Sequence, residues 1–521
     1  MPLPSQQAKI LRWCAIILLS GVPGYAGLAA GAWMFVKYRR GVETVTYADI
    51  ALPWRWPEYQ IKRGEHAITL GFALLQRGKF DQGFYQLRVG MARAPGHRDG
   101  RLLLAQILAN SRRHDLARNT LMDGLNHHAS DPVYVGAVLE FLLSRQADRE
   151  VMSLGNRILA APDGTPALRD TAALHAARAA YYRGKYDQAD AYLHTGGLAA
   201  NLNAALLIAR MDWERGYREL ALVALRELYQ RHPEDEGIYI QLGEFLRESG
   251  QTDEARRGTV LHQVAHPDCP RPVIDRLLDL HRQSREDELR AAAQNALTAL
   301  PQPAGLLALG DFAATTGRVE LAQQVLEQAR NRQPADITPL RLMVVESMLV
   351  ASRHAEALEH VQTLLKQPGA DPALTNVAQG LLAIAHFGLG DPVSGHSALM
   401  TLMVRPDLRT ESLLAIANRL VAMEQRAPAR EILARAIALD RQNQPALARL
   451  IELDLEAENL AALPDNLRHL LTLRKPPRHV LTAAQRLLRQ DRHLFLPGRT
   501  ELLDALAQAL ARPAAASTAA G

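Results

Sequence analysis

Small and apolar residues recur along most of the chain with a period of about 34 positions, the period of stacked helix pairs. One series consists of Gly71, Ala105, Ala177, Ala209, Gly243, Gly310, Ala383 and Ala417. A second series, twelve positions further on, consists of Gly83, Ala117, Ala189, Ala221, Ala255, Ala322, Ala357, Gly395 and Ala429. Small side chains repeated at one phase mark places where two amphipathic helices approach most closely. The pattern therefore predicts pairs of short helices packed through these residues.

Turn residues agree with this spacing. Glycine stands between the two expected helices at Gly78, Gly184, Gly216, Gly250, Gly317 and Gly390, and proline follows the second at Pro95, Pro233, Pro267, Pro301 and Pro334. Glycine supplies left-handed turn conformations, and proline cannot continue a helix. We therefore predict an all-α chain with eleven helix pairs from residue 64 to about 442 and a degenerate twelfth pair at 444–475. Helical stretches at 478–490 and 500–512 are expected to cap the array within residues 476–512, and the low-complexity segment 513–521 is expected to be disordered.

These residues resemble the tetratricopeptide repeat, in which an aromatic residue, Leu-Gly, a turn glycine, Ala-x3-Phe and proline follow one another. One unit shows the pattern at Tyr239, Leu242, Gly243, Gly250, Ala255 and Pro267, with Thr259 where the family has Phe. The resemblance covers residues 64–475. It implies a right-handed α-solenoid of eleven to twelve helix pairs that binds a protein or peptide in a concave groove lined by the first helix of each pair.

The N-terminal part of the chain differs from the repeats. Residues 13–36 carry no charged side chain, and 24 residues are long enough to cross the roughly 30 Å hydrocarbon core of a bilayer. Basic residues flank the segment at Lys9, Arg12, Lys37, Arg39 and Arg40, and Trp13 and Trp33 lie near its ends. We predict a short tail at 1–12 and a single transmembrane anchor at 13–36. A cleaved signal peptide with its A-x-A site at 30–32, or a buried soluble helix, would also fit.

Residues 37–63 are expected to form a juxtamembrane linker. Two tryptophans in it, Trp54 and Trp56, stand on either side of Arg55 and between Pro53 and Pro57. Amphipathic indole rings settle at the membrane–water interface, and prolines oppose helix formation. The rings can therefore lie on the lipid interface, together with Trp13 and Trp33, or they can cover the open apolar end of the first helix pair.

Composition narrows the function. The chain has 521 residues, more than one hydrophobic core usually holds, and a formal net charge of only +5. Basic and acidic residues are interspersed, so we expect no nucleic-acid partner. The two cysteines, Cys14 and Cys269, form no disulfide framework and leave the redox compartment open.

Two sequence clusters are candidates for chemistry. Gly390-x4-Gly395 followed by His396 resembles a phosphate-binding loop, but His stands where Lys is needed and both glycines fit the repeat. His262-x3-His266-x2-Cys269 has metal-ligand spacing, with a core histidine and a helix-end histidine as the alternative. We expect no metal, no cofactor and no catalytic residues, so the chain is predicted not to be an enzyme; a cryptic metal-dependent enzyme is the remaining alternative.

A partner-binding site is predicted on the first helices of the middle repeats. The residue after each small first-series position, and the one three further on, should face the groove. In these repeats the candidates are Arg178, Tyr181, Tyr182, Arg210, Trp213 and Arg247. Arginine and large aromatics are the residues that anchor protein interfaces. Because Glu214, Glu244 and Glu248 lie nearby, these side chains can instead form ion pairs within the chain.

The sequence therefore predicts a membrane-anchored scaffold that mediates protein–protein interaction in a bacterial cell-envelope assembly, single-pass in the inner (plasma) membrane. An alternative is a component of envelope polysaccharide synthesis or export, with Tyr181, Tyr182 and Trp213 stacking on sugars. Partner, pathway, side of the membrane, cleavage of the N-terminal segment and oligomeric state stay open.

Overall fold

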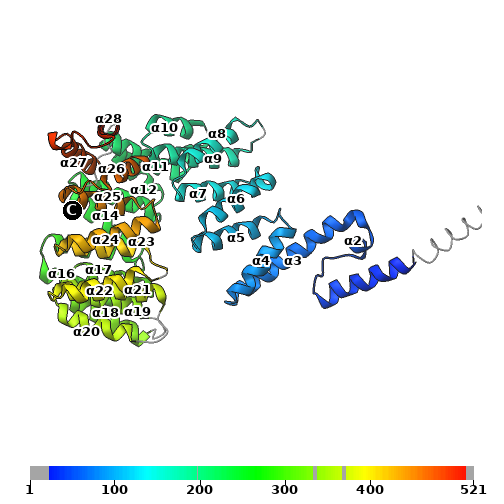
Figure 1. Cartoon of the computed structure of the whole chain (residues 1–521), viewed down its shortest axis with the longest axis horizontal. Helices are drawn as coiled ribbons and strands as arrows, with labels where there is room; N and C mark the ends of the chain where they lie inside the picture. The colour runs from blue at the N-terminus through cyan, green and yellow to red at the C-terminus, as the bar shows by residue number, and fades with distance from the viewer. Residues whose placement is uncertain are drawn as a thin grey trace, which may run out of the picture. The chain divides into compact units, whose positions relative to one another are not determined.

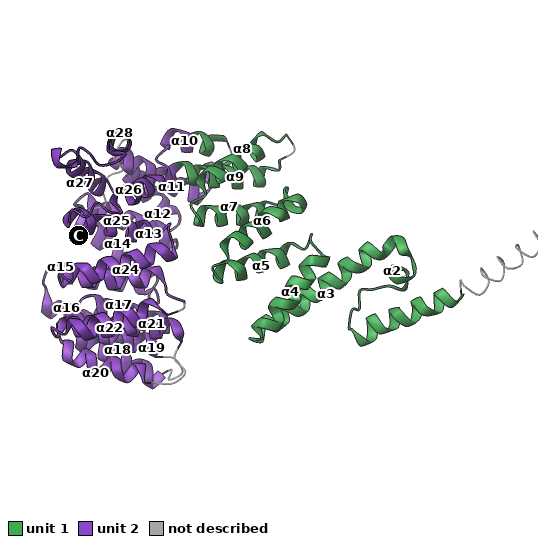
Figure 2. Cartoon of the chain, viewed as in Figure 1, with its two compact units in different colours: residues 1–180, 191–198 green, residues 181–190, 199–521 purple. Residues whose placement is uncertain are grey.

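A computed structural model of the chain describes residues 23–162, 164–195, 197–332, 337–366, 371–405 and 407–511. They divide into two compact units, residues 1–180 with 191–198 and residues 181–190 with 199–521 (Figure 2). The described residues form helices and turns and contain no strand, as the sequence predicts (Figure 1). The expected tail at 1–12, Trp13 and the segment 513–521 lie outside the described residues.

Unit 1 begins with a helix at residues 23–34 and continues with short elements and helix pairs. They are η1 (Phe35–Arg39), α2 (Tyr47–Ala51), η2 (Pro53–Arg55), α3 (Trp56–Gln76), α4 (Phe80–Arg93), α5 (Arg98–Asn110), α6 (His114–His128), α7 (Pro132–Ser144) and α8 (Asp148–Ala160). Helices α9 (Pro166–Tyr182) and α10 (Tyr186–Thr195) contribute residues to both units.

Unit 2 contains the remaining helix pairs and the C-terminal helices. They are η3 (Leu198–Ala200), α11 (Leu202–Arg215), α12 (Arg218–Arg231), α13 (Glu236–Glu248), α14 (Thr252–Ala265), α15 (Pro270–Arg282), α16 (Glu286–Ala299), α17 (Pro303–Thr315), α18 (Val319–Arg332), α19 (Thr338–Val350), α20 (His354–Leu365), α21 (Pro372–Gly388), α22 (Pro392–Met403), α23 (Thr410–Ala422), α24 (Arg426–Leu439), α25 (Gln444–Glu456), α26 (Leu463–Thr472), α27 (Arg478–Leu488), η4 (Asp491–His493) and α28 (Arg499–Ala511). The predicted capping stretches correspond to α27 and α28.

The turn inside each pair has the same backbone conformation throughout the array. A residue with positive φ stands there at Gly78, Arg112, Gln146, Gly184, Gly216, Gly250, Ser284, Gly317, Ser352, Gly390, Glu424 and Glu458. Successive members are separated by the repeat period, so the phase holds even where glycine is missing. This conformation reverses the chain within a few residues and sets the second helix against the first.

Small residues lie where the paired helices are closest. A Cβ atom placed on Gly71 of α3 would lie 3.1 Å from the carbonyl oxygen of Gly83 on α4, and one on Gly83 would lie 3.0 Å from the carbonyl oxygen of Gly71. The alanines at the same phase, such as Ala177, Ala209 and Ala221, are completely buried. A larger side chain would not fit at Gly71 or Gly83, which confirms the packing role predicted for these positions. Gly243 differs, because the atoms nearest to a Cβ there would be those of the Arg247 side chain of the same helix, at 3.4 Å.

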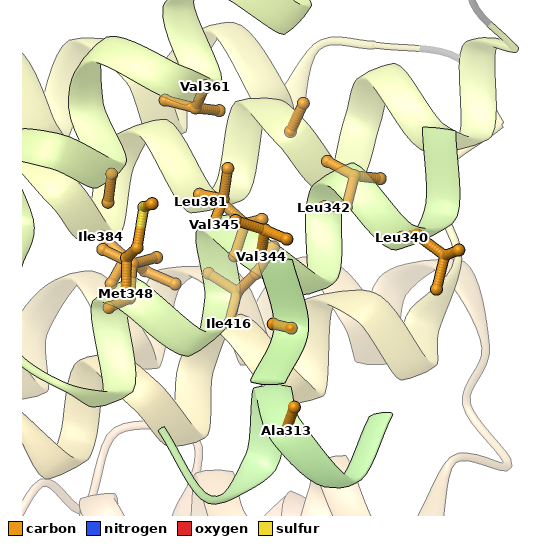
Figure 3. Packing of buried hydrophobic residues seen from close by; sticks show 14 of the residues in the cluster. Ala313, Leu340, Leu342, Val344, Val345, Met348, Val361, Leu381, Ile384 and Ile416 are labelled. Carbon is orange, nitrogen blue, oxygen red and sulfur yellow. The ribbon is translucent and has the colours of Figure 1, made fainter. Parts of the chain in front are cut away.

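The core of unit 2 is a continuous layer between helices of successive pairs. Its largest cluster extends from Val273 to Leu453. Figure 3 shows how Val345 and Met348 of α19 point into this layer beside Leu381 and Ile384 of α21. Each pair buries apolar side chains between its own two helices and also against the neighbouring pairs, and the second contribution exists only in an array.

The N-terminal segment folds back on itself instead of leading directly to the repeats. The Trp33 indole donates a hydrogen bond to the carbonyl oxygen of Val45 at 3.0 Å, and the Tyr25 hydroxyl donates one to Ala51 at 2.9 Å. Val36 and Val45 belong to a small apolar cluster beside them. The helix at 23–34 and η1 therefore pack against the segment that follows.

The predicted linker at 37–63 contains α2 and the first residues of α3. Pro57 does not oppose the helix, because the first turn of a helix needs no backbone N–H donor from it. Trp54 is 75% exposed and Trp56 53% exposed, so neither ring is enclosed by the first helix pair. This disagrees with the alternative in which both rings cover that pair.

None of the helices in the described ranges combines the length and the apolar character that crossing a membrane requires. Residues 13–22 of the predicted span lie outside the described residues, and residues 23–34 are helical.

Candidate functional site

The predicted site residues fall into both compact units, so they are considered unit by unit. In unit 1, Arg178 of α9 forms an ion pair with Glu140 of α7, with Nη1 2.6 Å from Oε2. His175 lies on the same carboxylate, with Nε2 3.4 Å from Oε2. The hydrogen bond from His175, together with Arg178, lowers the pKa of Glu140 to about 2. Arg178 thus links two successive first helices.

In unit 2 the carboxylate of Glu214, on α11, is the centre of a polar cluster. It accepts hydrogen bonds from the Tyr181 hydroxyl at 2.6 Å, the Tyr186 hydroxyl at 2.7 Å and the Lys475 ammonium at 2.6 Å. The Lys475 Nζ also lies 3.4 Å from the centre of the Tyr181 ring. We call Tyr181, Tyr186 and Glu214 the Glu214 site. It encloses the ammonium between a carboxylate and an aromatic face.

Burial and hydrogen bonding oppose each other in this cluster. Burial disfavours the charged form of Glu214, but the hydrogen bonds from Lys475, Tyr181 and Tyr186 outweigh it and hold the pKa of Glu214 below its usual value. Burial raises the pKa of Tyr181 and of Tyr186, and the neighbouring Glu214 carboxylate adds to this. Both phenols therefore stay protonated and act as donors at neutral pH.

Lys475 belongs to the connection between α26 and α27, and its neighbours also contact this region. The Arg183 guanidinium donates a hydrogen bond to the carbonyl oxygen of Thr472 at 2.6 Å. The Arg474 guanidinium lies over the Tyr182 ring, 4.1 Å from its centre. The segment 472–475 is thus held within unit 2 by residues more than 250 positions away in the sequence.

The remaining predicted residues of unit 2 lie along the next first helices. Arg210 pairs with Glu244 of α13 at 3.3 Å, and both side chains stay partly exposed. Trp213 is buried, stacks on Phe245 with 4.1 Å between ring centres, and donates its indole N–H to Glu248 at 3.0 Å. Arg247 is half-buried one turn from Gly243.

In the structure these residues make contacts within the chain. Arg210 pairs with Glu244, one of the glutamates named from the sequence, whereas Arg178 pairs with Glu140, which was not among them. Tyr181 and Tyr182 lie against the basic side chains of Lys475 and Arg474. Because Trp213 and Tyr181 are buried, their ring faces are not open for stacking on a sugar. Sequence reasoning missed Lys475, Arg474 and Arg183, since pairing across more than 250 positions has no local signal. It also missed Tyr186, which lies on the second helix α10, outside the first-helix positions that were considered. The basic, proline-containing stretch at 473–477 was the only indication.

In the histidine cluster near Cys269, His262 packs as part of the structure. His262 is buried and stacks on Tyr239, with 4.2 Å between ring centres and 7° between planes. The Tyr229 hydroxyl lies 3.2 Å from its Nδ1, and burial lowers the pKa of His262. Across the described ranges, no group of three His, Cys, Asp or Glu side chains is placed to hold a metal ion.

An open pocket of about 680 Å³ lies in unit 1 near the ends of α4 and α6. His97, Arg98, His127, His128 and Asp131 are among the lining residues. Two of them already cap helices, because His97 accepts from the Gly100 N–H and Asp131 from the N–H groups of Val133 and Tyr134. These contacts account for His97 and Asp131 without a ligand.

Comparisons with known proteins are distant. No protein-family profile and no curated protein matches the chain. Among solved structures, the crystal structure of the APC/C hetero-tetramer Cut9-Hcn1 is 13% identical, with a TM-score of 0.28, and the match covers 88% of this chain and 95% of that one. A tetratricopeptide repeat protein from Parabacteroides merdae is 13% identical, with a TM-score of 0.29, and the match covers 48% of this chain and 96% of that one. Neither likeness is close enough to assign a function.

Proposed function

We propose that this protein is a membrane-anchored scaffold of the tetratricopeptide-repeat type, whose right-handed array of helix pairs binds a protein partner. The observation that carries this proposal is the regular turn in each pair, at one phase from Gly78 to Glu458. An array built from one repeated unit presents an extended face on which successive first helices each contribute side chains. Arginine side chains such as Arg210, partly exposed on that face, are suited to anchoring a protein surface.

The membrane anchor is supported by the N-terminal sequence and by the side chains that follow it. Residues 13–36 are uncharged and end at Lys37, Arg39 and Arg40. Leu28, Phe35, Tyr38, Trp54 and Trp56 are all exposed in unit 1. Exposed aromatic and aliphatic side chains beside a basic cluster fit the interface of a bilayer. We place the anchor in the inner (plasma) membrane of a bacterium, as a single span.

A membrane anchor would favour partner binding by raising a local concentration. A scaffold held at the membrane raises the effective concentration of its binding face for other components of the same membrane. This fits a role in a cell-envelope assembly, in which the array positions a partner without changing it chemically.

Membrane attachment can be tested by extraction. The full chain should stay in the membrane fraction after alkaline carbonate treatment, while Leu28→Lys should be partly released, because a charge at the centre of a span costs several kcal/mol. Leu116→Lys is the matched control, since Leu116 is an exposed leucine on α6 in the repeats. Equal retention of all three proteins would contradict a span through residue 28.

Partner binding can be tested by crosslinking in membranes. The variant Arg210→Ala/Arg247→Ala removes two cations from the first-helix face, and Arg256→Ala/Arg257→Ala removes two exposed cations from the second helix α14. The proposal expects the first variant to lose a specific crosslinked protein that the wild type and the second variant retain. If all three proteins give the same crosslinks, either the partner binds away from Arg210 and Arg247 or the array has no specific partner.

A further inference from the structure

The Glu214 site is built as a receptor for one ammonium group. Glu214 and Lys475 are mostly enclosed, with side-chain exposures of 14% and 24%. Every polar atom of the site is directed at the carboxylate or at the ammonium: two phenols donate to Glu214, and Lys475 completes its set of donors. The aromatic rings of Tyr181 and Tyr186 lie 3.4 Å and 5.5 Å from Nζ. Carboxylate and ring faces together select a cation.

The residue that fills this site, Lys475, has an unfavourable backbone conformation. Lys475 has a φ of +39°, in the left-handed region that side chains other than glycine rarely adopt. It also precedes Pro476, a position that favours extended backbone. Such strain persists only where surrounding contacts hold it, and it is typical of ligand clamps and switch segments. The contacts of the ammonium thus hold a segment that would otherwise relax.

The segment carrying Lys475 is not part of a helix. Residues 473–477 connect α26 to α27 and carry the sequence LRKPP. Arg474 rests on the Tyr182 ring next to the Glu214 site, so two consecutive basic side chains contact three tyrosines and one glutamate. A short irregular stretch with this chemistry binds as a peptide ligand would.

We propose that the Glu214 site binds a lysine side chain of a partner protein, presented in a basic Arg-Lys segment, and that Lys475 is an internal ligand that the partner displaces. The inference rests on the proposed function, because the lysine is taken to come from the protein that the array binds. The rings of Tyr181 and Tyr182 then contact the partner in place of residues 474–475.

Peptide binding to the full chain tests this proposal. The probe is a fluorescent peptide with the sequence of residues 471–479, LTLRKPPRH. The variant Arg474→Ala/Lys475→Ala removes the internal ligand and is expected to bind the probe at least about tenfold more tightly than the wild type. The control Arg486→Ala/Arg489→Ala removes two exposed cations, one on α27 and one directly after its end, and should behave as the wild type.

Specificity is tested with the same variant. Adding Glu214→Gln, or replacing the probe lysine by methionine, should abolish the gain, because the carboxylate–ammonium contact is then lost. If the double variant does not fold, as judged by circular dichroism, Lys475→Met alone replaces it.

The proposal is overturned if removing the internal ligand gives no gain in affinity, or if the gain survives Glu214→Gln. Such a result with partner capture intact would make Lys475 a purely structural clasp and leave the scaffold function standing. If the crosslinking in membranes captures no partner protein at all, the proposed scaffold function is itself contradicted.

Discussion

Gly250 and Ser284 occupy the same turn in successive helix pairs, with φ of +79° and +56°. One is a residue for which this conformation costs nothing, and the other is a residue that it strains. The array therefore imposes one turn geometry on both, whatever the local preference of the sequence.

Substitutions at these two turns should have opposite effects. Gly250→Ala should lower the free energy of unfolding by about 1–2 kcal/mol, because a Cβ there meets no atom within 4 Å but forces a left-handed alanine. Ser284→Gly should raise it by up to about 1 kcal/mol. Urea denaturation followed by circular dichroism measures both. Ser284→Ala is the control and should be nearly neutral; equal effects of Gly and Ala at 284 would show that the turn is not strained.

Close approach of paired helices gives a second prediction. Gly83→Ala should destabilise unit 1 by about 1–3 kcal/mol, because its Cβ would lie 2.7 Å from Leu75 Cγ and 3.0 Å from the Gly71 oxygen. Gly258→Ala, in the helix α14 with nothing within 4 Å of the added atom, should stabilise its helix by about 0.5–1 kcal/mol. Hydrogen exchange of α4 and α14 reads each site locally. Equal shifts at the two sites would rule out the packing explanation.

Trp213 is expected to act through stability rather than through ligand contact. Trp213→Ala removes a buried ring stacked on Phe245 and should cost about 3–5 kcal/mol, while Trp213→Phe retains most of the packing and should cost less. Thermal unfolding of the full chain compares the two. A Trp213→Ala protein as stable as the wild type would mean that the ring is not part of the core.

The buried carboxylate of Asp49 should make the N-terminal fold sensitive to acid. Burial opposes its charge, but hydrogen bonds from Lys62 and Thr46 lower the pKa of Asp49 from 3.8 to about 2. Its folded-state pKa is thus below the unfolded value, so its contribution is present in full above pH ~4 and is lost as the pH falls toward 2. The size is about 2 kcal/mol.

Hydrogen exchange of residues 42–51 measures this contribution. Asp49→Asn should increase exchange at pH 6, and its difference from the wild type should shrink as the pH falls from 4 to 2. Asp115→Asn, on α6, serves as a carboxylate control outside this cluster. A difference that is constant with pH would contradict the stabilisation of the charged form.

The sequence by itself determined the helix pairs and their phase. Small residues such as Gly71 and Gly83, and turn residues such as Gly78, act locally and recur at one spacing, so each pair can be recognised without the others. The same phase places Arg112 and Gln146 in turns where glycine is missing. The period of the sequence also assigns Tyr181 and Tyr182 to one first helix, α9, and Arg210 to the next, α11.

Only the tertiary structure decided which side chains meet. Trp213 turns into the core toward Phe245, and Lys475 reaches Glu214 across 261 positions of sequence. Both contacts depend on how helix pairs pack against one another within unit 2, and this packing leaves no trace in the spacing of residues along the chain.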